Sequence, residues 1–163
     1  MQAQYTSLIH QFCTLVGVHG AGDIDALANG HPLEIDGIGF TFGHDPQQAP
    51  DRLLVFCDYG PVPKTLEAKV YRALLETNLF LYESDGGVFS ILPDTGRALC
   101  ATRFQLSTLR AEELRSILVY LSGRAHAWRH SHFDVALAPL DGALSRRQNA
   151  AGAVLRAQLT SPR

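Results

Sequence analysis

Hydrophobic residues recur every three or four positions in three segments of the chain, which is the spacing of an amphipathic helix. The segments cover residues 4–17, 61–80 and 107–130. Pro63 suits an early position in the second helix, and Thr108 suits the N-cap of the third. We therefore expect three helices. The apolar stripe of the first helix consists of Tyr5, Leu8, Ile9, Phe12, Leu15 and Val16.

Five shorter runs favour β-strands. Asp36-Gly37 is a strong hairpin signal between the first two runs, because both residues tolerate the positive φ angles of a two-residue turn. Residues 18–32 are rich in glycine and polar residues, so we expect them to form mostly loop. The predicted strands are "LEIDGI" (33–38), "GFTF" (39–42), "RLLVFCDY" (52–59), "GVFSIL" (87–92) and "RALCATRFQL" (97–106).

The order of these elements is α-β-β-β-α-β-β-α, which predicts an α+β fold with a five-stranded antiparallel sheet and three helices. We assign residues 1–133 to a single domain. The remaining residues, 134–163, form an alanine-rich C-terminal tail that is either flexible or weakly helical.

Composition excludes several classes of protein. Net charge is −2 and only 18% of residues are charged, so we expect neither nucleic-acid binding nor attraction to anionic membranes. The apolar runs are too short to span a bilayer, and the first residues do not resemble a signal peptide. Cys13, Cys57 and Cys100 are an odd, widely spaced set, which favours free core thiols in a reducing cytoplasm.

Asp94-Thr95-Gly96 matches the signature of aspartic proteases, so it raises the possibility of a catalytic carboxylate. However, Pro93 precedes this tripeptide and Arg97 follows it, a pattern that is ordinary for a tight turn between two strands. A positive charge next to paired carboxylates would also oppose the shared-proton state that such proteases use. We favour the turn.

His126, His130 and His132 suggest a metal site, since the first two lie four residues apart on a predicted helix. No third ligand has a convincing spacing, and a solvated or tail-packed helix end is the better interpretation. The chain also lacks a phosphate-binding loop and a nucleophile elbow. We therefore expect no catalytic residue, no metal, no cofactor and no enzymatic activity.

Apolar residues point to both faces of the predicted sheet. In the third strand, Leu53 and Val55 alternate with Leu54 and Phe56. Three helices cover about one face, so the other face either lies under loops and the tail or binds a partner, which is a second copy or another protein. The second helix also carries two apolar stripes, which favours partner binding.

Residues 3–130 resemble the class I type III secretion chaperones of the Tir-chaperone (CesT-type) family. The resemblance rests on the order of elements and on three local patterns rather than on one strong motif. These patterns are "YTSLIHQFCTLVGV", "LLETNLFL", and "ILPDTGRALCATRFQL" followed by "LRAEELRSILVYLSGRAHAWR".

The resemblance implies a cytoplasmic bacterial homodimer without enzymatic activity. Such a chaperone binds the non-globular N-terminal segment of a secreted effector, keeps it competent for secretion and aids its delivery; a component of the secretion apparatus is a further possible partner. The alternative is a regulatory or protein-binding module of the same fold that does not serve secretion.

Carried over from the family, the resemblance also implies two sets of site residues. The dimer interface would comprise Val70, Tyr71, Leu74, Leu75, Asn78, Phe89 and Ile91. The effector-binding residues would be Phe12, Leu15, Val16, Phe40, Phe42, Leu54 and Phe56.

Overall fold

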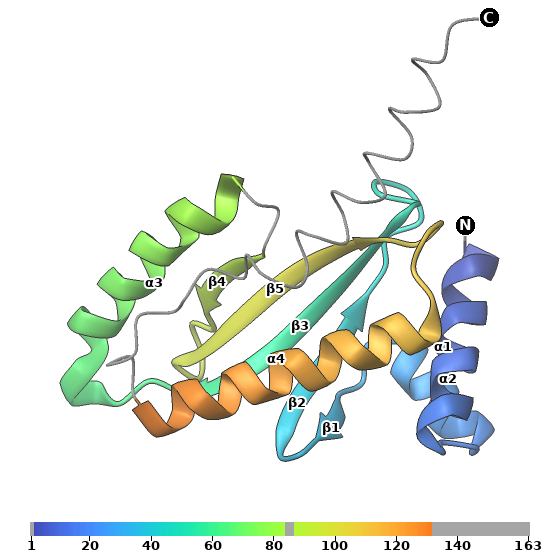
Figure 1. The fold of residues 1–163 in the computed structure, drawn as a ribbon, viewed down its shortest axis with the longest axis horizontal. Helices are drawn as coiled ribbons and strands as arrows, with labels where there is room; N and C mark the ends of the chain where they lie inside the picture. The colour runs from blue at the N-terminus through green and yellow to red at the C-terminus, as the bar shows by residue number, and fades with distance from the viewer. Residues whose placement is uncertain (1, 84–86, 132–163) are drawn as a thin grey trace, which may run out of the picture.

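The computed structural model describes residues 2–83 and 87–131. The predicted α+β class is confirmed, and the strands lie where the sequence patterns place them (Figure 1). The tail predicted for residues 134–163 lies outside the described residues. The elements are α1 (Gln2–Val16), α2 (Ala21–Ala28), β1 (Leu33–Ile35), β2 (Ile38–Gly43), β3 (Arg52–Pro61), α3 (Glu67–Glu83, after a 3-10 turn at Lys64–Leu66), β4 (Val88–Ile91), β5 (Arg97–Gln105) and α4 (Ala111–Ser131).

The five strands form one antiparallel sheet in the order β1-β2-β3-β5-β4. The predicted hairpin joins β1 to β2, and Asp36 and Gly37 have φ angles of 50° and 73°, which are typical of a two-residue primed turn. The β3–β5 pairing is the longest and contains a register shift between Asp58 and Gly60. The sheet therefore has β1 at one edge and β4 at the other.

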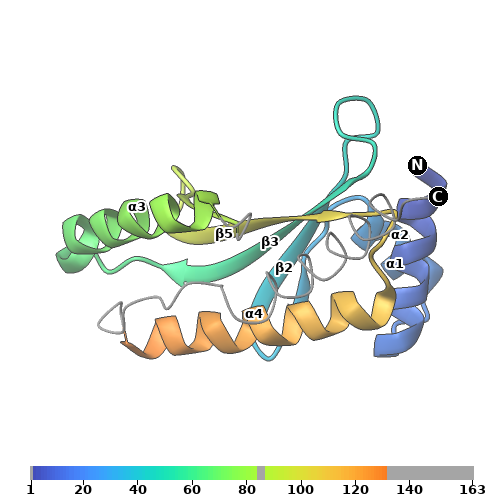
Figure 2. The same cartoon turned by 45° about the horizontal axis from the view of Figure 1, so that its top comes forward.

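One face of the sheet carries the hydrophobic core. Side chains of β3 alternate strictly, so that Leu53, Val55 and Cys57 are buried while the residues between them are half-buried. Figure 2 shows α4 running along this inner face, with α1 and α2 at one end of the sheet and α3 at the other. A T-shaped contact between Phe12 of α1 and Phe42 of β2 joins the N-terminal helix to the sheet.

Residues 18–32 are not mostly loop, because they contain α2, which raises the number of helices among the described residues from the predicted three to four. The glycines in and around this segment lower its helix propensity, so the short apolar pattern of Ile24 and Leu27 did not predict a helix. Ile24 and Leu27 are buried, and the Tyr5 hydroxyl donates a hydrogen bond of 2.9 Å to the Ala28 carbonyl. Packing on α1 therefore stabilises a helix that is too short to be favoured by its own sequence.

The last helix begins at Ala111, so the prediction of Thr108 as its N-cap is wrong. Thr108 lies in the preceding turn, where its hydroxyl donates to the Gln105 carbonyl. The carboxylate of Asp51 organises this connection by accepting hydrogen bonds from Gln105 and from the backbone and side chain of Ser107. These hydrogen bonds hold residues 105–108 in a turn, so α4 does not extend back to them.

Arg129 ties the C-terminal half of α4 to the sheet through three backbone carbonyls. Arg129 donates hydrogen bonds of 2.9 Å to the backbone carbonyls of Gly37, Asp58 and Tyr59. Gly60 has a φ of 107°, and a Cβ atom there would lie 3.1 Å from Nε of Arg129. The irregularity in β3 thus creates the space that the guanidinium fills.

Candidate functional site

Asp94 lies in the turn that joins β4 to β5. Gly96 adopts a φ of 64°, and its N–H donates to the Leu92 carbonyl at 2.8 Å, which closes the connection between β4 and β5. Asp94 itself is exposed. Arg97 pairs with Asp58 on the neighbouring strand β3. The interpretation of Asp94-Thr95-Gly96 as a turn is confirmed.

The histidines of the last helix bond to backbone carbonyls. Nε2 of His126 lies 2.6 Å from the Asp36 carbonyl oxygen, and Nδ1 of His130 lies 2.8 Å from the His126 carbonyl oxygen. His132 lies outside the described residues. Within the described ranges, no three His, Cys, Asp or Glu side chains are arranged to hold a metal ion.

All three cysteines are free and buried, as predicted for core thiols. Cys57 and Cys100 face each other across β3 and β5. Burial raises the pKa of the Cys100 thiol to about 11, and burial raises the pKa of the Cys57 thiol further still. Because the thiolate is the reactive form of cysteine, these side chains are packing residues in this fold.

Helix α3 has one buried and one exposed apolar face. Val70 and Leu74 belong to the core, whereas Leu75 and Leu79, one turn apart, are 71% and 69% exposed. Tyr71, one turn before Leu75, is half-buried. Two large leucines on adjacent turns with this exposure form a surface that a partner can bury.

The same helix closes one edge of the sheet. Asn78 donates its side-chain amide to the Phe89 carbonyl at 2.9 Å, and its side-chain oxygen accepts the Phe89 N–H at 2.7 Å. This pair of bonds occupies backbone groups of β4 that an additional strand would need. The side chain of Asn78 therefore links α3 to β4 and blocks strand addition at this position.

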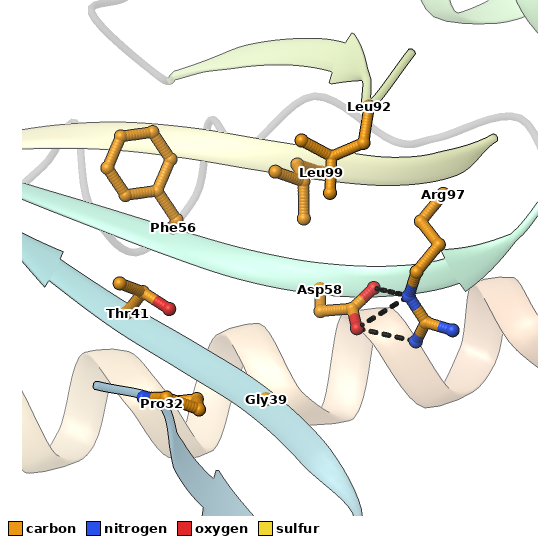
Figure 3. A pocket seen from close by; sticks show the side chains of 8 residues that line it. All are labelled: Pro32, Gly39, Thr41, Phe56, Asp58, Leu92, Arg97 and Leu99. Carbon is orange, nitrogen blue, oxygen red and sulfur yellow. Dashed lines mark hydrogen bonds and ion pairs between the residues drawn. The ribbon is translucent and has the colours of Figure 1, made fainter. Parts of the chain in front are cut away.

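The face of the sheet opposite α4 carries a pocket of about 340 Å³. In Figure 3 its side chains rise from β2, β3, β5 and the β4–β5 turn, while α4 lies behind the sheet. Phe56, Leu92 and Leu99 supply apolar surface, and the Asp58–Arg97 ion pair forms one end. The lining residues are Pro32, Gly39, Thr41, Phe56, Asp58, Leu92, Arg97 and Leu99.

The structure separates the site residues implied by the family resemblance into two groups. Six are buried in the core. The other eight are exposed or half-buried. The core group is Phe12, Phe40, Phe42, Val70, Leu74 and Phe89, and the accessible group is Leu15, Val16, Leu54, Phe56, Tyr71, Leu75, Asn78 and Ile91.

Sequence reasoning missed several accessible residues. Leu79 was detectable, because it follows Leu75 by four positions on the same helix. The pairing of Arg97 with Asp58 had no sequence signal, since it depends on strand register across 39 positions of the chain. Gly39 gave no signal either, because its place in the pocket lining depends on its neighbours on the sheet.

The Tir chaperone protein (CesT) family matches residues 7–129 of the chain, which is well over half of its length. The protein belongs to this family. Comparison with curated protein sequences gives no match. Over the described residues, no helix of this CesT-family protein combines the length and the apolar character needed to cross a membrane.

Solved structures share its fold. A chain of the ExsC–ExsE complex is 19% identical with a TM-score of 0.66, and the match covers 87% of this chain and 98% of the other. A chain of the HopA1–SchA chaperone–effector complex is 17% identical, with a TM-score of 0.60 and coverage of 79% and 95%. The Yersinia pestis type III secretion chaperone SycH, in complex with a stable fragment of YscM2, is 20% identical with a TM-score of 0.55. This match covers 76% of this chain and 98% of the other.

Proposed function

We propose that this CesT-family protein is a cytoplasmic type III secretion chaperone. It would bind the non-globular N-terminal segment of a secreted effector, keep that segment competent for secretion and aid its delivery. The family match over residues 7–129 carries the proposal. The similar complexes support it, since one is described as a chaperone–effector complex and another contains a type III secretion chaperone with a bound fragment.

The working unit would be a homodimer that uses α3. Leu75 and Leu79 give this helix an exposed apolar face, and the half-buried Tyr71 continues it toward the helix start. Fully burying a leucine contributes about 1.5–3 kcal/mol, so pairing this face with the same face of a second copy would be favourable. Dimerisation would also double the surface offered to an extended client.

The client would contact the outer face of the sheet and the edge at β1. Asn78 occupies part of the opposite edge, whereas no other strand of the described chain pairs with the outer side of β1. An extended segment added there would gain main-chain hydrogen bonds, and its alternate side chains would point to the side of the sheet that carries the pocket. A long contact is needed, because ordering such a segment costs about 2–5 kcal/mol.

Co-expression tests this function directly. The full chain is co-expressed with the N-terminal fragment of each secreted protein encoded beside its gene, and the affinity-purified material is analysed by light scattering. We expect a stable complex with one such fragment and no complex with the folded C-terminal domain of the same effector. A chain that captures no secreted protein, or one that captures only a protein that is not secreted, would favour the alternative regulatory module.

A further inference from the structure

Strand β1 forms an edge of the sheet with one exposed charge between two apolar residues. Leu33 and Ile35 pair with buried residues of β2, so their half-buried side chains lie on the inner face. Glu34 points to the opposite face, is exposed, and stands opposite Gly39, which has no side chain. Within the described part of the chain, the Glu34 carboxylate makes no hydrogen bond or ion pair. The edge is therefore apolar-acidic-apolar.

The backbone of Glu34 is the part of this edge that another strand can use. In a hairpin with a two-residue turn, the residues that flank the turn are hydrogen-bonded to each other, and here they are Ile35 and Ile38. Because hydrogen bonding alternates along an antiparallel pair, the N–H and C=O of Glu34 point away from β2. A strand added here would bond to these two groups, and one of its side chains would lie beside the carboxylate.

A charge in the middle of an edge strand selects among the strands that pair with it. Opposite charges that face each other across two strands stabilise the pair, whereas like charges destabilise it. A charged side chain on an edge also discourages pairing with uncharged strands. The complement of Leu33-Glu34-Ile35 is therefore a segment with a basic residue between two apolar ones.

The C-terminal segment of the same chain contains this complement. Residues 155–159 read Leu-Arg-Ala-Gln-Leu, which alternates apolar and polar side chains at the period of a strand. Residues 142–163 contain four arginines and no aspartate or glutamate, whereas residues 1–51 contain six acidic residues and no lysine or arginine. The two ends of the chain therefore attract each other, and β1 belongs to the acidic end.

The last helix ends beside this edge of the sheet. Nε2 of His126 lies 2.6 Å from the Asp36 carbonyl oxygen, and Arg129 donates a hydrogen bond of 2.9 Å to the Gly37 carbonyl. Asp36 and Gly37 form the turn that directly follows β1. The chain therefore leaves α4, at Ser131, on the side of the domain that carries the β1 edge.

The connection is long enough for the C-terminal segment to reach β1. The 24 residues from 132 to 155 separate α4 from Arg156, and a chain of this length spans up to about 80 Å. Joining two partners by a short linker gives an effective concentration on the order of 1 mM. A pairing with a dissociation constant below this value is mostly formed in the intact chain.

We propose that residues 155–159 pair with β1 of their own domain as an additional antiparallel strand. The facing pairs are Arg156 with Glu34, Leu155 with Ile35, and Ala157 with Leu33. The added strand occupies the edge at which a client segment would be added, so a client must displace it. That consequence rests on the proposed chaperone function, whereas the pairing itself does not.

Hydrogen exchange of the isotope-labelled full chain, followed by NMR without a client, tests the pairing. The Glu34 amide points away from β2, so we expect a protection factor of about ten or more only if another strand accepts its hydrogen bond. Arg156→Glu places like charges opposite each other and should lower this protection about three- to tenfold, with a smaller effect at high salt. A Glu34 amide that exchanges at the unprotected rate in the wild type would overturn the proposal.

Two further variants separate strand pairing from net charge. Arg146→Glu changes the charge of the C-terminal segment by the same amount but lies outside residues 155–159, so it should leave the protection close to that of the wild type. Arg156→Glu combined with Glu34→Arg restores an opposite-charge pair and should recover the protection of the amide at position 34. Equal losses in the two single variants, or no recovery in the double variant, would contradict the proposed pairing.

A disulfide identifies the copy of the chain that supplies the strand. Residues that share both hydrogen bonds in an antiparallel pair lie about 5.5 Å apart between Cα atoms, which a disulfide spans. In Glu34→Cys combined with Arg156→Cys, oxidised glutathione should oxidise the two introduced thiols to a disulfide and be reduced to glutathione, while the native cysteines stay buried. The product should run as a monomer on a non-reducing gel. A dimer band would assign the strand to a second copy and overturn the proposal.

This proposal and the chaperone function fail separately. If position 34 is protected as expected but the wild type captures no secreted protein, the pairing stands and the chaperone function falls. If capture succeeds while the Glu34 amide exchanges at the unprotected rate, the chaperone function stands and the pairing falls.

Discussion

The two long helices, α3 and α4, hold the sheet in different ways. Helix α4 lies along the inner face, buries a continuous apolar stripe that includes Leu118 and Leu121, and ends with Arg129 bonded to three backbone carbonyls. Helix α3 lies at the β4 end of the sheet (Figure 1) and is joined to that strand through Asn78.

This difference separates residues that stabilise one copy of the chain from residues that are free to bind another. Both helices have apolar residues at helical spacing, yet in α4 one large apolar side chain, Val119, is strongly exposed, at 53%, whereas α3 exposes Leu75 and Leu79 to about 70% each on adjacent turns. An isolated exposed valine is ordinary on a protein surface, but two adjacent leucines are not. The second apolar stripe of α3 therefore indicates a partner.

The largest effect should come from the core of α4. Leu118 is fully buried, so Leu118→Ala removes packing and leaves a cavity. We expect the free energy of unfolding, measured by chemical denaturation, to fall by about 2–5 kcal/mol. A loss below about 1 kcal/mol would show that α4 is not integrated into the core as described.

On α3 the largest effect should be on assembly and not on folding. Leu75→Asp combined with Leu79→Asp places two charges on the exposed face, so we expect a folded monomer by light scattering and circular dichroism. Leu74 must be left intact, because it is buried and an aspartate there would unfold the chain. Val119→Asp on α4 is the matched control and should remain dimeric; a double variant that also stays dimeric would place the interface elsewhere.

The link between α3 and β4 should contribute less. Asn78→Ala removes two hydrogen bonds to the backbone of Phe89, each worth about 0.5–1.5 kcal/mol. We expect unfolding to become easier by about 1–3 kcal/mol and the Phe89 amide to exchange with solvent faster, as measured by hydrogen exchange. Unchanged protection of that amide would mean that Asn78 does not close the β4 edge.

The smallest effect belongs to the tripeptide that resembles a protease signature. Asp94 is exposed in its turn, so Asp94→Asn should change the stability by no more than about 0.5 kcal/mol and leave assembly unaltered. Gly96→Val is the contrasting variant, because a β-branched residue is strained at a φ of 64°, and it should lower stability by about 1–3 kcal/mol. A loss of peptide-cleaving activity in Asp94→Asn would revive the catalytic interpretation.

The spacing of hydrophobic residues and the residues typical of turns predicted most of the fold. The helical periodicity of three segments, the five short β-like runs and the Asp36-Gly37 turn were sufficient to place the strands and the three long helices. The short helix α2 escaped detection because glycine lowers helix propensity, and its stability comes from the burial of Ile24 and Leu27 against distant residues. Tertiary contacts of this kind leave little trace in local sequence.

The candidate site was less accessible to sequence reasoning. Alternation in β3 correctly divided Leu53 and Val55 from Leu54 and Phe56, but it does not state which face the helices cover. Phe40 and Phe42 therefore entered the predicted contact set although they lie in the core. The Arg97–Asp58 pair depends on the register of two strands, which local patterns do not specify.

The central claim is that α3 exposes an apolar surface and that a second copy of the chain covers it. The mass of the full chain in solution tests this claim most directly. Light scattering across a range of concentrations should give about twice the chain mass of 17.8 kDa, because each copy buries the Leu75 and Leu79 face of the other. A mass of 17.8 kDa at every concentration would contradict the account, since a stable monomer would leave both leucines in water.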